Sequence, residues 1–255
     1  MRIVIKIGTS TLAHPTGHLN IRRVEEICKV ISDIKNAGNE IIMVSSGAIG
    51  MGVGKLGLAT RPTDIPTKQA AAAVGQCELM YIYDKLFGEY NHTVGQLLIT
   101  GADIQHEGRH QNFSNTMNRL IEMGAIPIIN ENDTVATEEI VIGDNDTLAA
   151  IVAESVKADL LILLSDIQGL YTADPHKDEN ARLIHCVNAV TDELYALAGG
   201  GGKQGTGGMV TKLDAAKICL ACGCDMIITD GGEPDCLYDI VDGKPIGTRF
   251  TAKEK

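Results

Sequence analysis

Aromatic and basic residues are scarce in this chain, and their scarcity already excludes several classes of protein. Phe, Tyr and Trp make up 4% of the 255 residues, with no Trp, so the core has to be built from aliphatic side chains. The 22 lysines and arginines are outnumbered by 33 aspartates and glutamates, which gives a net charge of −11. Such a chain has no general electrostatic attraction to nucleic acid or to an anionic membrane. Any phosphate that it binds must be held by a few placed cations and by backbone N–H groups.

Long apolar runs and an even set of cysteines are also missing. No stretch reaches the roughly 18 uncharged apolar residues of a membrane-spanning helix. The first residues, MRIVIK, are too few and too charged for a secretory signal. Seven cysteines, an odd number, are typical of a reduced protein rather than of a disulfide framework. We therefore expect a cytoplasmic protein.

The pattern of the chain predicts an α/β fold, because β-rich runs alternate with helix patterns. This alternation favours a mainly parallel sheet with helices on both faces. The expected strands are residues 2–7, 40–44, 94–99, 125–129, 160–164, 226–229 and 247–250. The expected helices are a segment capped by Asn20 and ended by Gly38, and residues 67–87, 147–156 and 213–221. No repeat or linker divides the chain, so we expect one domain over residues 1–255.

Glycine-rich or polar turns follow several of the expected strands, at residues 8–10, 45–52, 130–134 and 165–169. In a parallel α/β sheet, ligands bind beyond the carboxyl ends of the strands. The sequence therefore predicts a binding site at this edge of the sheet.

Two of these turns are suited to an anion. Lys6 ends the first expected strand, and Gly8 follows it in a turn whose N–H groups can face a phosphate. A strand end with a solvated lysine explains the same residues. Ser46 and Gly47 lie at a strand-to-helix turn that exposes backbone amides. A tight connection that needs glycine for steric reasons explains that turn equally well.

Two clusters of Asn and Asp lie thirteen residues apart. Asn130 and Asp133 belong to NEND at residues 130–133, and Asn145 and Asp146 belong to GDND at residues 143–146. An amino-acid substrate would supply an ammonium for Asp133, and Asp146 could hold two lysines in place. Surface turns are also rich in these residues, so each cluster alone is a weak indication.

A glycine loop precedes the last expected long helix. Residues 205–212, GTGGMVTK, place Lys212 next to the start of that helix, which suits a phosphate cradle. The loop is not a Walker A motif, because no Gly-Lys-Ser/Thr occurs in the chain. The alternative is a flexible glycine loop without a ligand.

Three further patterns are better explained by ordinary structure. HEGRH at residues 106–110 spells a zinc-peptidase motif, but Gly108 disfavours the continuous helix that this motif needs. GVGKLG at residues 52–57 matches G-x-G-x-x-G but starts too long after its strand for a dinucleotide turn. Cys219, Cys222 and Cys224 are expected to be small core residues.

Taken together, the motifs resemble those of the amino acid kinase family, and within it the members that phosphorylate the side-chain carboxylate of glutamate. The resemblance runs from Val4 to Phe250. It rests on KIGTS at 6–10, SGAI at 46–49, NEND at 130–133, GDND at 143–146, GLYTADP at 169–175 and GTGGMVTK at 205–212.

The resemblance implies a three-layer αβα sandwich and a role for each matching residue. Lys6 and Lys212 would flank the transferring phosphoryl group, with Asp146 between them. The N-terminal part of the chain would bind glutamate through Ser46, Gly47, Asn130, Asp133 and Asn145. The C-terminal part, together with Lys6 and Gly8, would bind the nucleotide through Ser165, Asp166, Thr206, Gly207, Gly208, Met209, Val210, Thr211 and Lys212. No residue is assigned as a metal ligand.

The same resemblance implies substrates, partners and a pathway. The substrates would be L-glutamate and ATP with Mg²⁺, and the product L-glutamyl 5-phosphate, the first intermediate of proline biosynthesis. Feedback inhibition by proline, handover to glutamate-5-semialdehyde dehydrogenase and a homo-oligomer are expected on the same ground. Many bacterial members carry an additional C-terminal PUA domain, and we expect a short form without it. The alternatives are a kinase similar to N-acetylglutamate kinase, or an amino-acid sensor without catalysis.

Overall fold

A sheet of eight strands forms the centre of the computed structural model, which describes residues 1–14, 16, 18–135, 145–175, 177–198 and 208–251. The strand order is β3-β4-β2-β1-β5-β7-β8-β6. Neighbouring strands pair in parallel, except that β7 and β8 are antiparallel. The strands are β1 (Arg2–Ile7), β2 (Glu40–Ser45), β3 (Val94–Ile99), β4 (Ile126–Glu131), β5 (Leu160–Ser165), β6 (Cys186–Val187), β7 (Asp225–Asp230) and β8 (Thr248–Phe250).

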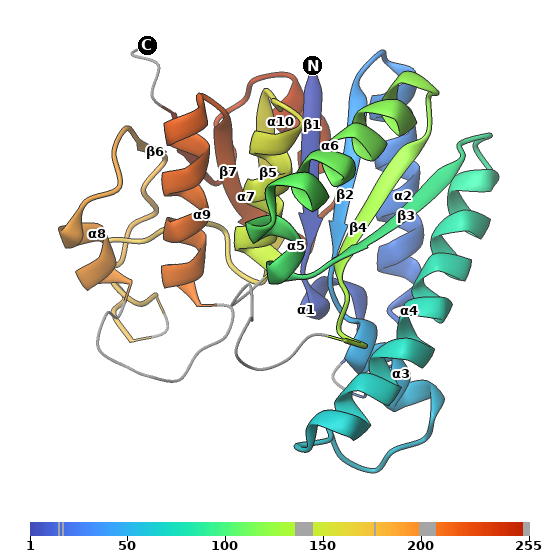
Figure 1. Cartoon of the computed structure of the whole chain (residues 1–255). Helices are drawn as coiled ribbons and strands as arrows, with labels where there is room; N and C mark the ends of the chain where they lie inside the picture. Colours follow the sequence, from blue (N-terminus) through green and yellow to red (C-terminus); the bar gives the residue numbers. More distant parts are fainter. Residues whose placement is uncertain (15, 17, 136–144, 176, 199–207, 252–255) are drawn as a thin grey trace.

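Helices cover both faces of this sheet and complete a three-layer αβα arrangement, as the sequence predicts (Figure 1). One face packs against α2, α3, α4 and α10, and the other against α6, α7 and α9. The helices are α1 (Thr9–Leu12), α2 (Ile21–Asn36), α3 (Ala48–Lys55), α4 (Ile65–Gly88), α5 (Gly101–Gln105), α6 (Glu107–Glu122), α7 (Asn145–Ser155), α8 (Asp192–Leu197), α9 (Met209–Cys222) and α10 (Cys236–Val241).

Alternation along β1 decides which layer receives each of its side chains. Ile3, Ile5 and Ile7 belong to the core that faces α2 and α4, whereas Val4 belongs to the core that faces α7 and α9. Successive side chains of a strand point to opposite faces. Lys6 is therefore directed to the same side as Val4, toward the layer that contains α7 and α9.

Local signals fix the ends of the helices that support this sheet. The side chain of Asn20 accepts a hydrogen bond from Arg23 N and caps α2, and Gly38 has the positive φ of +93° that suits the residue after a helix. Asp64 caps α4 in the same way. Ile21, the first residue of α2, is 61% exposed although its side chain is apolar.

The glycines of residues 52–57 serve the packing of two helices. A Cβ on Gly52 would collide with the carbonyl oxygen of Ala71, and one on Gly75 would collide with that of Ala48. Helices α3 and α4 can therefore touch backbone to backbone only because both positions are glycine. In the part of the chain that the structure describes, no helix has both the length and the apolar character needed to cross a membrane.

Candidate active site

Two lysines from distant parts of the chain meet across one aspartate at the carboxyl end of β1. Lys6 Nζ lies 2.6 Å from Asp146 Oδ1, and Lys212 Nζ lies 3.0 Å from Asp146 Oδ2. The Asp146 side chain is fully buried, and the two lysine side chains are only 8% and 6% exposed. The structure thus brings together the three residues that the sequence predicts to act on the phosphoryl group.

The fold explains why these three residues converge. Lys6 is the next-to-last residue of β1, Asp146 lies in the first turn of α7, and Lys212 is the fourth residue of α9. The two helices pack on the same side of the sheet and begin at the edge where β1 and β5 end. The N-terminal end of a helix carries a partial positive charge, which favours a carboxylate there.

The electrostatics of this group are set by opposing effects. Burial raises the pKa of the Asp146 carboxyl, but the charges of Lys6 and Lys212 outweigh it and hold that pKa below its ordinary value. Asp146 is therefore ionised at neutral pH. One negative and two positive charges leave the buried group with a surplus of one positive charge, which favours an anion beside it.

A cluster of amides adjoins the lysine group, because Asn145 directly precedes Asp146 in the chain. The two hydrogens of Asn145 Nδ2 are shared among three acceptors, the Ser45 carbonyl oxygen at 2.9 Å, Ser46 Oγ at 2.8 Å and Asn130 Oδ1 at 3.1 Å. Gly47 has a φ of +91° and precedes α3, so it turns the chain sharply after Ser46. Four of the residues predicted to bind glutamate thus lie close together, namely Ser46, Gly47, Asn130 and Asn145.

Asp133 is half-buried beyond the end of β4. Burial raises the pKa of its carboxyl above the ordinary value. Within the described residues it forms no hydrogen bond or ion pair with the lysine group or the amide cluster. A cation from a ligand would stabilise its ionised form.

The residues predicted to bind the nucleotide are described in part. Gly208, the residue before α9, has no side chain with which to cap the first N–H groups of that helix, which include those of Met209 and Val210. Thr211 Oγ1 lies 2.8 Å from the Gly208 carbonyl oxygen and 3.5 Å from Asp146 Oδ2. Thr206 and Gly207 lie outside the described residues.

The ends of β1 and β5 lie side by side in this region. Ser165 Oγ donates to Asp166 Oδ1 at 3.2 Å. Gly8 N donates to the Leu164 carbonyl oxygen at 3.3 Å, and a Cβ on Gly8 would lie 3.8 Å from Lys6 Nζ. Gly8 therefore keeps the space next to the Lys6 ammonium open.

Two residues of α4 also contact the site, and the sequence analysis missed them. Gln76 Oε1 accepts a hydrogen bond from Asn130 Nδ2 at 2.8 Å, and Tyr83 Oη lies 3.0 Å from Ser45 Oγ. Both are buried in a helix whose other inward residues are mostly apolar. Their spacing of seven residues, which places them on one helical face, is the signal that could have identified them.

The remaining sequence patterns have structural explanations. His106 Nδ1 accepts from Arg109 N at the start of α6, and His110 Nε2 lies 2.8 Å from Ser155 Oγ. These two imidazoles therefore have separate partners, and the described residues contain no cluster of three or more His, Cys, Asp or Glu that could hold a metal. Cys219 and Cys224 are core residues as predicted, whereas Cys222, the last residue of α9, is exposed.

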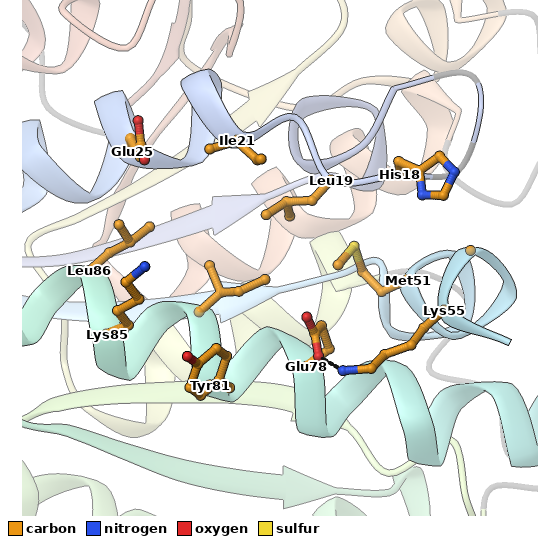
Figure 2. A pocket seen from close by; sticks show the side chains of 12 residues that line it. His18, Leu19, Ile21, Glu25, Met51, Lys55, Glu78, Tyr81, Lys85 and Leu86 are labelled. Carbon is orange, nitrogen blue, oxygen red and sulfur yellow. Dashed lines mark hydrogen bonds and ion pairs between the residues drawn. The ribbon is translucent and has the colours of Figure 1, made fainter.

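A hollow of about 540 Å³ lies apart from the site, between α2, α3 and α4 (Figure 2). Its wall includes the apolar side chains of Leu19, Met51 and Leu86, with an ion pair between Lys55 and Glu78 at its rim. None of the predicted site residues lines it.

Comparison with known proteins places the chain in a family. The model of the family described as "Amino acid kinase family" matches residues 1–230. The chain belongs to the amino acid kinase family. It is 51% identical over 258 residues to a protein of Clostridium perfringens named glutamate 5-kinase, with 99% of this chain and 96% of that protein covered. It is 52% identical to a protein of the same name from Listeria monocytogenes, with 100% and 94% covered.

Solved structures of this family share the fold at low identity. Carbamate kinase from Giardia lamblia bound to AMP-PNP matches with a TM-score of 0.70 and 18% identity, covering 99% of this chain and 98% of that one. Isopentenyl phosphate kinase from T. acidophilum, in a product complex, matches with a TM-score of 0.68 and 18% identity, covering 98% and 100%. These likenesses confirm the αβα architecture expected for a member of the amino acid kinase family.

Proposed function

We propose that the protein is an ATP-dependent kinase that phosphorylates the side-chain carboxylate of L-glutamate. The observation that carries the proposal is the buried group in which Lys6 and Lys212 both contact Asp146. The relatives named glutamate 5-kinase, at about half identity over the whole chain, support glutamate as the acceptor. We assign the glutamate site to the N-terminal part and the nucleotide site to the C-terminal part of a single domain.

The proposed reaction needs charge neutralisation and positioning more than proton transfer. An oxygen of the glutamate side-chain carboxylate forms a bond to the γ-phosphorus of ATP. The bond from that phosphorus to the oxygen bridging it to the β-phosphate breaks, and ADP leaves with the electron pair. The carboxylate is already ionised near neutral pH, so no general base is required. Two anions repel each other, and two placed ammonium groups lower that repulsion.

Each part of the site has a role in this proposal. Lys6 and Lys212 would contact the transferring phosphoryl oxygens, and Asp146 would hold both lysines in position. The N–H groups at the start of α9 would bind phosphate oxygens of the nucleotide. Ser46 and Asn145 would hold the substrate, and Asp133 would pair with its ammonium.

Mg²⁺ would enter with ATP. In proteins this ion usually keeps several waters and is held by substrate phosphates with one or two carboxylates. Both oxygens of Asp146 already contact lysines, and the described residues contain no protein cage for the ion. The ion would therefore take most of its ligands from the phosphates of the nucleotide and from water.

The product and the chemistry of the chain suggest the wider context. An acyl phosphate is destroyed by water, which favours prompt transfer to a reductase such as glutamate-5-semialdehyde dehydrogenase in proline biosynthesis. All seven cysteines lie in the described residues and are unpaired, which supports a reduced, cytoplasmic setting. Proline as feedback inhibitor and a homo-oligomer belong to the same proposal by resemblance to the family.

The test measures ADP release with a panel of acceptors, and a hydroxylamine trap detects the acyl phosphate. We expect turnover and trapped product with L-glutamate and little with aspartate or N-acetylglutamate. Turnover with N-acetylglutamate alone would show that the acceptor is N-acetylglutamate and not glutamate. Binding of glutamate without any ADP release would favour the alternative function, an amino-acid sensor without catalysis.

A further inference from the structure

A buried pair of amides connects the middle of α4 to the end of β4. Gln76 is 8% exposed and Asn130 is 2% exposed, and Asn130 Nδ2 donates to Gln76 Oε1 at 2.8 Å. Buried amides cost free energy unless they are hydrogen-bonded, and apolar residues fill such a position more cheaply. A buried Gln on a mostly apolar helix face therefore needs an explanation in terms of what its partner does.

The backbone fixes the direction of this hydrogen bond. Asn130 Oδ1 accepts from Glu131 N at 2.9 Å, and a backbone N–H can only donate. The opposite end of the Asn130 amide, Nδ2, must then point toward Gln76. Gln76 must present its oxygen, so the assignment of both amides follows from one fixed donor.

A second backbone group fixes Asn145. Its Nδ2 donates to the Ser45 carbonyl oxygen at 2.9 Å, and a carbonyl oxygen can only accept. The same Nδ2 reaches Asn130 Oδ1 and Ser46 Oγ. Asn130 therefore supports Asn145 only while its own amide keeps the orientation that Gln76 stabilises.

We propose that Gln76 is a positioning residue of the acceptor site, because its Oε1 holds the Asn130 amide in the orientation that anchors Asn145 beside Ser46. The inference deepens the proposed function and rests on it for the identity of the substrate. Since Ser46 Oγ accepts from Asn145, its own hydroxyl hydrogen is directed away from Asn145 and can serve a substrate carboxylate.

The tight packing of α4 on α3 holds the backbone of Gln76 in a fixed position. Its neighbour Gly75 packs so closely on Ala48 that a Cβ would collide with the Ala48 carbonyl oxygen. The backbone of α4 is thereby fixed against the start of α3, directly after Gly47. Gln76 consequently approaches Asn130 from a fixed backbone.

The first test compares two substitutions of Gln76. Gln76→Leu removes the acceptor at similar size, and Gln76→Glu retains an acceptor oxygen. We expect Gln76→Leu to raise KM for glutamate about tenfold, because a buried donor is left unpaired. KM for ATP should stay within about twofold, and Gln76→Glu should lie closer to the natural protein. Equal rises of both KM values in Gln76→Leu would overturn the positioning role.

Leu79→Ala is the matched control, because it removes buried packing contacts of the same helix three residues after Gln76. Leu79 belongs to the apolar core, and its side chain has no polar atom that could join the chain of amides. We expect a loss of thermal stability at least as large as that of Gln76→Leu but a nearly natural KM for glutamate. If Leu79→Ala raises this KM as much as Gln76→Leu does, the cause is a loosened α4 and the proposal fails.

A double-mutant cycle tests the route through Asn130. In an Asn130→Ala background, Gln76→Leu should change KM by less than about twofold, because the group on which it acts is gone. A further tenfold rise would show that Gln76 acts by another route.

Side-chain NMR separates this inference from the proposed function. Without substrate, Gln76→Leu should shift the NH₂ signals of both Asn130 and Asn145, whereas Leu79→Ala should leave them in place. Unchanged NH₂ signals in Gln76→Leu overturn the positioning role whatever the substrate is. If the natural protein does not turn over glutamate but Gln76→Leu shifts the signals, the proposed function fails and the amide chain stands.

Discussion

Replacing Asp146 by Asn removes the one negative charge from a buried group of three. The substitution keeps the size of the side chain but leaves Lys6 and Lys212 buried without their shared counter-charge. Removing one partner of a buried ion pair destabilises a protein by about 3–5 kcal/mol. We expect Asp146→Asn to lose stability in this range at pH 7. With a slope of about 2–3 kcal/mol per M, its urea midpoint should fall by about 1–2.5 M.

The loss should depend on pH in a defined direction. The pKa of Asp146 is lowered in the folded protein, so its stabilising contribution is complete above the unfolded value near 3.8. That contribution is lost as the pH falls through the lower folded pKa. The difference between the natural protein and Asp146→Asn should be constant from pH 5 to 8 and shrink below pH 4.

A triple variant distinguishes charge from packing. In Asp146→Asn with Lys6→Met and Lys212→Met, no charge remains in the group, and apolar replacement of a buried ion group is often neutral or stabilising. We expect this variant to recover most of the lost stability, as measured by urea unfolding, while phosphoryl transfer stays absent. If the triple variant is as unstable as Asp146→Asn alone, unpaired charge is not the cause and our reasoning is wrong.

Three further substitutions test single roles. Lys212→Ala should lower kcat by about 10²–10³-fold in the ADP-release assay, because a placed cation at the transferring group is lost; an unchanged kcat with a higher KM would make Lys212 a binding residue only. Asp133→Asn should raise KM for glutamate by about tenfold or more. Burial raises the pKa of Asp133 in the folded protein, so ionisation of Asp133 costs stability as the pH rises through that pKa. Asp133→Asn should therefore be more stable than the natural protein at pH 7 and should lose this advantage below pH 4. A less stable variant at pH 7 would contradict this reasoning. Gly8→Ala should unfold like the natural protein, since its Cβ makes only ordinary contacts, yet raise KM for ATP by filling space beside Lys6; an unchanged KM would show that this space is not used.

The sequence was sufficient to predict the strand that carries Lys6 and most of the two helices that carry Asp146 and Lys212. The expected helices begin at residues 147 and 213, whereas α7 begins at Asn145 and α9 at Met209, so the turns that contain Asp146 and Lys212 were left out. β1 and β3 begin and end where the residue pattern indicates. For β1 the reason is that a parallel strand buried on both sides is a continuous apolar run between polar turns, whereas β3 is a partly exposed strand at the edge of the sheet. The carboxyl ends of parallel strands meet at one edge, so turns far apart in the chain must lie together. This topological rule brings Lys6 near Asp146.

Helix α3 shows where local preference fails. Its eight residues include Gly50, Gly52 and Gly54, and each glycine disfavours a helix by about 1 kcal/mol relative to Ala. The helix forms nevertheless because Gly52 permits close contact with Ala71 of α4. That contact is tertiary and leaves no local signal in the sequence.

Helix α6 was predictable but was missed as a full helix. Its buried residues Phe113, Met117 and Ile121 are spaced by four, which is a helical pattern among polar neighbours. The pair of Gln76 and Asn130 is different, because the two residues are 54 positions apart and nothing nearby predicts their contact. Long-range pairing of polar groups is decided by the packing of the whole layer.

The charge of the site makes sense only together with the charge of the whole chain. A protein with a net charge of −11 repels ATP and glutamate at long range, so the attraction must come from a small region. Two lysines alone would repel each other in a buried space, and Asp146 between them reduces that repulsion without cancelling their charge. The surplus of one positive charge is less than the charge of a triphosphate, so the incoming anion completes the neutralisation. Binding of the substrate anion therefore also neutralises the remaining positive charge of the buried group.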